Sequence, residues 1–208
     1  MANQVVFDSL GWLDPVGGMA AMSRARDDRP LLMDVCWRRL RGWRRILSQG
    51  LDPAFAPGAI EGVGDLTLEH GPHALTQAWL LVGWLARRLG WRPEGGKIAP
   101  GTELTWRFLS PQGQIRVTAR RLPEGPPEIL SMCVAPRAGQ GAAILVFESG
   151  QGGRLMVRNE GPTGGVRTLA LGVSSRAAMV ARQLSDLAPD PIFRDTFAVA
   201  CAMAMSLS

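Results

Sequence analysis

Residues 74–91 constrain the fold more than any other part of this 208-residue chain. Their apolar side chains recur every three or four positions, a spacing typical of one face of an α-helix. A second apolar stripe, through Leu80, Trp84 and Trp91, runs along another side of the same segment. A helix that is apolar on two sides is either central in the fold or partly covered by a partner.

From residue 102 onward the apolar residues alternate with polar ones, which indicates strands. This pattern and the Gly- or Pro-bearing turns predict strands at 104–108, 115–119, 129–134, 143–147, 154–158 and 166–171. Short connections between them favour an antiparallel meander. Two earlier strands are expected at 4–7 and 64–70.

Four more helices are expected from their capping residues. The first two cover 14–26 and much of 36–49, and Gly50 ends the second. Near the carboxyl terminus, Ser174 or Ser175 can cap one helix, and Asp190 begins the last.

These elements predict an α+β fold, in which an antiparallel-rich mixed sheet carries the long Trp-rich helix and the two C-terminal helices. We expect a single domain over 1–208, with subdomains 1–95 and 96–208 as the alternative.

Composition excludes several classes of protein. An apolar fraction of 46% with 20% charged residues is globular rather than disordered. Three widely spaced cysteines do not form a disulfide framework and fit a reducing compartment. Without a leader pattern or an apolar run of about 20 residues, we expect a cytoplasmic protein with no membrane anchor.

The sequence shows no arrangement typical of a catalytic centre. His70 and His73 could share a metal, but a site normally has three or four ligands, so a solvated loop is the favoured interpretation. Cys36, Cys133 and Cys201 are more typical of buried structural thiols than of nucleophiles. The glycine-rich segments lack the strand, helix and Lys of a phosphate loop. We therefore predict a non-enzyme with no metal and no cofactor.

The most unusual segment is 37–45, which holds five arginines and two tryptophans. Three interpretations are open. The segment can be an amphipathic helix with Leu40, Trp43 and Leu47 inside and the arginines in solvent. It can grip acidic residues of a protein with tryptophan as the anchor, or bind single-stranded nucleic acid by charge and stacking. Lys97 is the only lysine among 23 basic residues, so a coding bias toward arginine is an alternative to an acidic partner.

Two segments resemble a known family. The spacing of Trp37, Arg39, Leu40, Trp43 and Arg44 is similar to the Trp-x-Arg-Leu-x-x-Trp-Arg start of a helix in the OpcA family, the glucose-6-phosphate dehydrogenase assembly or effector proteins. Residues 80–91 resemble that family's Gly-Trp-Leu-Ala-x-Arg-Leu-Gly-Trp element, and residues 5–9 and 174–197 are similar to its neighbouring segments. The chain resembles the carboxyl-terminal portion of the longer members.

The resemblance implies a non-catalytic effector of the pentose phosphate pathway that binds glucose-6-phosphate dehydrogenase and promotes its active oligomeric state. The alternative is a basic nucleic-acid-binding module that uses 37–45. The family offers no catalytic residues, so the partner-binding residues are our own hypothesis. They are Trp37, Arg38, Arg39, Arg41, Trp43, Arg44, Trp84, Arg87, Arg88 and Trp91.

Overall fold

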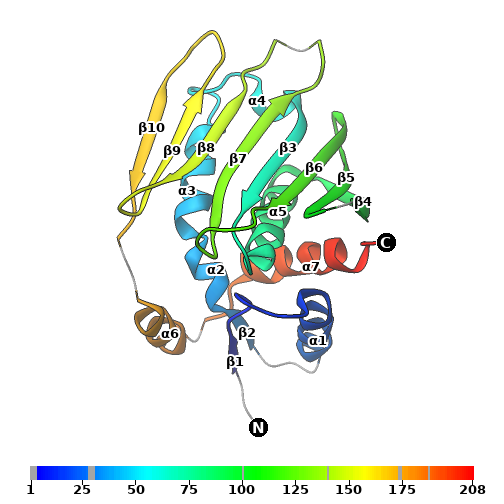
Figure 1. Ribbon diagram of the computed structural model, residues 1–208, viewed down its shortest axis with the longest axis vertical. Coiled ribbons are helices and arrows are strands. Elements are labelled where there is room, and N and C mark those ends of the chain that lie inside the picture. Colours follow the sequence, from blue (N-terminus) through cyan, green and yellow to red (C-terminus); the bar gives the residue numbers. More distant parts are fainter. Residues whose placement is uncertain (1–3, 28–30, 100, 140, 173–174, 187) are drawn as a thin grey trace.

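The computed structural model describes residues 4–27, 31–99, 101–139, 141–172, 175–186 and 188–208 (Figure 1). The helices are α1 (Pro15–Asp27), α2 (Val35–Arg39), α3 (Arg41–Gly50), α4 (Ala59–Gly62), α5 (Leu75–Leu89), α6 (Arg176–Ser185) and α7 (Pro191–Met205). The strands are β1 (Gln4–Phe7), β2 (Leu31–Asp34), β3 (Val63–His70), β4 (Arg92–Ile98), β5 (Glu103–Ser110), β6 (Gly113–Arg121), β7 (Ile129–Pro136), β8 (Leu145–Gly150), β9 (Arg154–Asn159) and β10 (Val166–Ala170). No helix within these ranges is both long and apolar enough to cross a bilayer.

Eight strands form one mixed sheet in the order β10-β9-β8-β7-β3-β6-β5-β4. Only the β3–β6 pair is parallel, and the other neighbours are antiparallel. β1 and β2 form a separate parallel pair, joined by α1. The sheet thus has the antiparallel-rich, mixed character that the alternation predicts.

Helices α3 and α5 cover one face of the sheet, α3 over β8 to β10 and α5 over β3 and β6. α7 packs on α5 and on β4, so α5 lies between the sheet and α7 (Figure 1). Both apolar stripes of α5 are therefore buried inside the chain, and the helix is central rather than dependent on a partner. Gly83 permits the close approach of α5 and α7, because a Cβ there would lie 3.0 Å from the Thr196 carbonyl oxygen.

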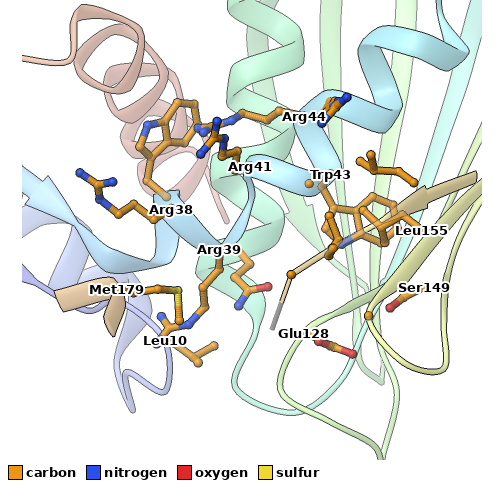
Figure 2. Close-up of a pocket in the computed structure, with 18 of the residues that line it drawn as sticks. Leu10, Arg38, Arg39, Arg41, Trp43, Arg44, Glu128, Ser149, Leu155 and Met179 are labelled. Carbon is orange, nitrogen blue, oxygen red and sulfur yellow. The ribbon is translucent and has the colours of Figure 1, made fainter. Parts of the chain in front are cut away.

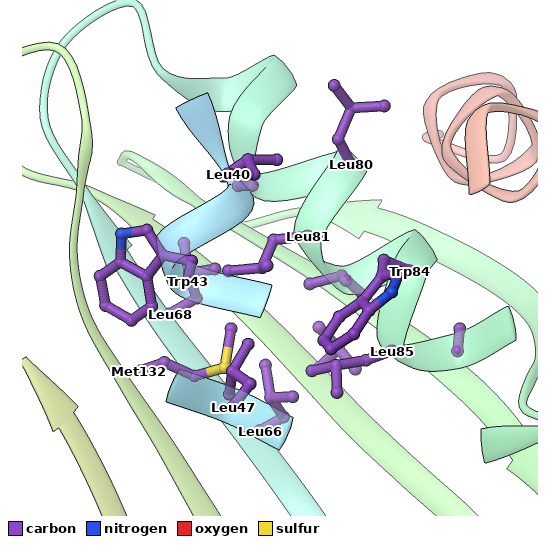
Figure 3. Close-up of a cluster of buried hydrophobic side chains, with 14 of the residues drawn as sticks. Leu40, Trp43, Leu47, Leu66, Leu68, Leu80, Leu81, Trp84, Leu85 and Met132 are labelled. Carbon is purple, nitrogen blue, oxygen red and sulfur yellow. The ribbon is translucent and has the colours of Figure 1, made fainter. Parts of the chain in front are cut away.

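The core lies between the sheet and these helices. Alternate strand residues point into it, since β6 alternates between buried and exposed positions. Figure 3 shows side chains from α3, α5, β3 and neighbouring segments gathered in this core: Leu47, Leu66, Leu68, Leu81, Trp84 and Met132.

The predicted α+β class is confirmed, and α5 and α7 lie where expected. Three details differ. β3 is inserted between β6 and β7, which interrupts the expected meander, because the apolar β3 pairs with both of them. α6 packs on α2 and β1 rather than on the large sheet. The helix expected over 36–49 is two helices that meet at Leu40.

The sequence prediction also missed two strands and left one cap open. β2 and β4 were not expected, since neither has a clear alternating pattern of its own. Ser175 caps α6 by accepting a hydrogen bond from the Ala178 backbone N–H, whereas Ser174 lies outside the described residues. A single domain over 1–208 stays a prediction, and the central place of β3 favours it over a division at residue 95.

Candidate functional site

A cleft of about 1240 Å³ opens between α2–α3, α6, the start of α7 and the turn between β8 and β9 (Figure 2). We call it the arginine cleft, because six arginines and only three carboxylate residues line it. The arginines are Arg38, Arg39, Arg41, Arg44, Arg45 and Arg182, and the acidic residues are Glu128, Asp186 and Asp190.

The wall formed by α2 and α3 is fixed at its start by Asp34. The Asp34 carboxylate caps α2 by accepting from the Cys36 N–H, and it also accepts from the Ser9 N–H and hydroxyl, at 2.8, 3.1 and 2.6 Å. At Leu40 the backbone changes direction and α3 begins. In Figure 2 Arg38 and Arg39 consequently point away from Arg41 and Arg44.

The tryptophans of the predicted partner-binding set are core residues, which corrects their predicted role as surface anchors. Trp37, Trp43, Trp84 and Trp91 are between 4% and 7% exposed. Trp37 packs against the Phe193 ring at 5.7 Å, and its indole Nε1–H donates to Asp190 at 2.8 Å. Apolar spacing on α3 and α5 places Trp43 and Trp84 in the core, and Trp91, just after α5, packs against the Phe108 ring of β5 at 6.3 Å. The burial of these rings stabilises the fold.

Two arginines of the set that line the cleft are held by carboxylates of this chain. Arg39 makes a bidentate pair with Asp8 at 2.6 and 2.8 Å. Burial alone would raise the pKa of Asp8, but its hydrogen bonds and charge interaction with Arg39 hold that pKa below the ordinary value. Arg38 binds Asp186 at 2.7 Å and Gln183. Both guanidinium groups are therefore committed to holding β1 and α6 against α2.

Arg44 is different, because its guanidinium lies flat on the Trp37 ring with Cζ 3.3 Å from the ring centroid. Burial, together with the charge of Arg41, lowers the pKa of Arg44 to about 10, although the Asp190 carboxylate opposes the shift. The group stays protonated at neutral pH. Its Nη1 is buried and has no hydrogen-bond partner within the described part of the chain.

The rest of the predicted set lies away from the cleft. None of Trp84, Arg87, Arg88 and Trp91 belongs to its lining. Arg87 and Arg88 are exposed at the end of α5, where Arg87 pairs with Asp195 of α7 at 3.2 Å.

Asp8, Asp34 and Cys36 are the one group among the described residues whose ligand atoms are close enough to hold a metal ion. Their present bonds fit a structural role better. Asp8 is neutralised by Arg39 and also pairs with Arg176 at 3.0 Å, and Asp34 already accepts three hydrogen bonds. Burial raises the pKa of the Cys36 thiol, so the thiolate that a metal needs is disfavoured.

The two histidines do not converge. His70 is buried and its Nδ1–H donates to the Gly71 carbonyl at 2.8 Å, while burial lowers its pKa. His73 is exposed, with a φ of +63°. Cys201 and Cys36 are buried as expected, but Cys133 is only half-buried on β7, which corrects the expectation that all three thiols are enclosed.

The acidic residues that organise the cleft could not be identified from sequence patterns. Asp186 and Asp190 lie about 150 positions from their partners on α2, so no local spacing reveals the contacts. Asp190 was recognisable only as a helix cap, and it does cap α7 by accepting from the Phe193 N–H at 2.9 Å.

Solved structures share the fold of this chain. A dehydrogenase (MviM) from Clostridium difficile matches 94% of this chain and 68% of its own, with a TM-score of 0.52 and 9% identity. The super-repressor mutant of Gal80p from Saccharomyces cerevisiae matches 89% of this chain and 64% of its own, with a TM-score of 0.54 and 8% identity. At such identities the likeness shows the fold alone.

Sequence relatives are more informative. Two proteins whose names contain the words OxPP cycle protein OpcA match, one from Synechococcus elongatus with 29% identity over 100 residues and one from Nostoc punctiforme with 28% over 93 residues. The matches cover 46% and 45% of this chain but only 22% and 20% of the relatives, so they span about a fifth of those proteins.

A family model covers most of the chain. It matches residues 30–197 and describes the C-terminal domain of the glucose-6-phosphate dehydrogenase subunit. The match includes the tryptophan–arginine segment and the tryptophan helix, so the resemblance that these residues indicated is confirmed. This chain belongs to that family of C-terminal domains, which is the carboxyl-terminal portion of OpcA.

Proposed function

We propose that this chain is a non-catalytic subunit that binds glucose-6-phosphate dehydrogenase and promotes its active oligomeric state. The observation that carries the proposal is the family match over residues 30–197. An effector of this kind acts only through its different affinities for the states of the enzyme, so it needs a contact surface and no reactive group.

The chemistry of the described residues supports a binding role. The acidic and thiol groups that come together near α2 are held in structural contacts, as Asp8 and Asp34 show. Because the tryptophans are buried, the contact surface must use other side chains. We propose that it uses the exposed arginines of the predicted set, Arg41 on α3 and Arg87 and Arg88 on α5.

Purified chain and glucose-6-phosphate dehydrogenase from the same organism test the proposal. We expect co-elution in size-exclusion chromatography, a larger fraction of the dehydrogenase in its highest oligomer, and increased activity at subsaturating substrate. No association at micromolar concentrations would rule out the proposed function.

A charge reversal locates the surface. Arg88→Glu removes an exposed cation that has no ion pair within the described residues, and we expect a weaker complex with an unchanged melting temperature. Arg107→Glu is a matched control, because Arg107 is also an exposed arginine and lies on β5 of the sheet. If Arg107→Glu weakens the complex and Arg88→Glu does not, the contact surface lies on the sheet instead.

Nucleic-acid binding is the second candidate, because the arginine cleft carries six arginines against three carboxylates. It predicts an affinity for single-stranded oligonucleotides that falls steeply with salt, through counterion release. The burial of Trp37 and Trp43 removes the stacking surfaces that such binding normally uses. A salt titration that detects no binding at low salt would end this alternative.

A further inference from the structure

The arginine cleft holds more positive charge than this chain neutralises. Of its six arginines, Arg38 and Arg39 are paired with Asp186 and Asp8. Among the described residues, no carboxylate lies within ion-pair distance of the other four. Those four are Arg41, Arg44, Arg45 and Arg182.

Two of the three acidic residues of the cleft are already occupied, and the third, Glu128, is exposed next to β7 and makes no ion pair with an arginine of the cleft. Asp186 is bound by Arg38. Asp190 accepts from the Trp37 indole and from the backbone of α7, one bond on each oxygen. The described lining of the cleft therefore offers the remaining four guanidinium groups no carboxylate within ion-pair distance.

Arg44 marks the point where an anion is missing. Its guanidinium is immobilised on the Trp37 ring, and the buried Nη1 has no acceptor in the described chain. Arg41 is close enough to act on it through charge, and Asp190, which acts on it with the opposite sign, forms no ion pair with either arginine (Figure 2). Buried polar groups are normally hydrogen-bonded, and the described chain supplies no acceptor for this donor.

We propose that Arg41 and Arg44 bind the phosphate group of a small phosphorylated metabolite in the arginine cleft. A phosphate monoester carries close to two negative charges at neutral pH and three terminal oxygens, so it can accept from two guanidinium groups at once. A single carboxylate has one charge and two oxygens, and it would leave one of the two arginines unbalanced.

The rest of the cleft has room for the body of such a ligand. Its volume of about 1240 Å³ exceeds what a phosphate needs. Residues 150–153 of the β8–β9 turn line the opposite side, and a Cβ at Gly152 would meet open space. Trp43, Leu155 and Phe193 contribute apolar lining. A sugar phosphate fits this mixture of polar rim and apolar wall.

The proposal does not depend on the dehydrogenase, so it is tested on the isolated full chain. Isothermal titration calorimetry with inorganic phosphate, and then with a hexose 6-phosphate, should each show one saturable site with a Kd in the millimolar range or tighter. We expect the hexose phosphate to bind more tightly, because it also contacts the cleft wall.

Substitution decides whether the site is the one described. Arg44→Gln and Arg41→Gln should each weaken phosphate binding about tenfold or more, since each removes charge-assisted hydrogen bonds. Arg107→Gln, exposed on β5 and outside the cleft, should leave it unchanged. If Arg44→Gln does not fold, as judged by near-ultraviolet circular dichroism, the exposed Arg41 decides the test alone.

Three results would overturn the proposal: no saturable binding of either phosphate, unchanged binding in Arg41→Gln, or binding of a different polyanion in place of phosphate. For the last, a single-stranded 12-mer and a heptaglutamate peptide are titrated in parallel. Binding of the 12-mer without free phosphate would assign the cleft to nucleic acid, and binding of the peptide alone would assign it to a protein.

Discussion

The structure predicts that the pKa of Asp34 differs between the native and the unfolded chain, and this difference can be measured as a change of stability with pH. Its carboxyl group is 1% exposed at the junction of β2 and α2, where it receives three hydrogen bonds. Burial raises its pKa to about 6 from 3.8, against the lowering effect of the bonds from Ser9 and Cys36, and the charge of Asp8 adds to the rise. The unfolded chain therefore ionises this group more easily than the native one does.

The sign and size of the effect follow from linkage. A carboxyl group whose native pKa is raised contributes stability that is complete below about pH 3.8 and is lost as the pH rises through about 6. A difference of about two pKa units corresponds to about 3 kcal/mol, of which about 2 kcal/mol falls between pH 4.5 and 7.5.

Asp34→Asn removes the ionisable carboxyl group and keeps the size and shape of the side chain. The amide oxygen can still accept from the Ser9 and Cys36 N–H groups, and the amide nitrogen can donate to the Ser9 hydroxyl. Urea unfolding followed by tryptophan fluorescence, at intervals from pH 4.5 to 7.5, gives the free energy of unfolding of both proteins. The advantage of the variant over the wild type should grow by about 2 kcal/mol across this range.

A control separates this effect from the general loss of negative charge. Asp65→Asn changes an exposed carboxyl on β3, and its stability should follow the wild type at every pH. If the curves of wild type and Asp34→Asn run parallel within about 0.5 kcal/mol, the native pKa of Asp34 is not raised, and its hydrogen bonds outweigh its burial.

Substitutions at three positions, Gly83, Asp190 and Arg39, test contacts that hold the helices and the cleft together. The free energy of unfolding is measured with urea or heat in each case. Gly83→Leu should destabilise the chain by about 2 kcal/mol or more, because its side chain would meet the α7 backbone, whereas Gly95→Ala, with open space around it, should change stability little. Asp190→Ala should lower the free energy of unfolding by about 2 kcal/mol, because α7 loses its cap and the Trp37 indole loses its acceptor. Asp190→Asn should lower it by about half as much, since one oxygen remains. Arg39→Met should lower the free energy of unfolding by about 2 kcal/mol, because its partner Asp8 is 9% exposed and would keep only the exposed Arg176 as an ion-pair partner. Equal stability of wild type and variant would refute the corresponding contact.

The positions of the helices and strands could be predicted from the sequence better than their arrangement in space. The two apolar stripes of α5 show that the helix is enclosed, but not that α7 rather than a partner encloses it. Alternation identifies most strands of the large sheet, whereas the insertion of β3 between β6 and β7 is a pairing over about 50 residues that no local pattern encodes. β4 has two adjacent glycines and a proline, so its strand character comes from pairing with β5.

The contacts of the candidate site were hard to predict for the same reason, since they join residues that are far apart in the sequence. Composition identified the segment with five arginines, but a cation is equally compatible with solvent, a carboxylate or a bound anion until its neighbours are known. Asp8 and Asp186 decide which arginines are neutralised, and each comes from a distant element. The burial of Trp37 was not predictable for a related reason: α7 and Arg44 cover its ring, and both contacts are set by tertiary packing.

The burial of the tryptophans changes what the arginines can do rather than removing their role in binding. Arginines on a solvated helix would sample many rotamers, and an anion that bound them would have to order each side chain. Here the Trp37 ring fixes Arg44, and Asp190 in turn fixes Trp37 through the indole N–H. A positive charge held in advance loses less conformational entropy when an anion arrives, so fewer contacts suffice for specific binding. The same rings that stabilise the core therefore make the cleft a better anion receptor than an exposed arginine-rich helix would be.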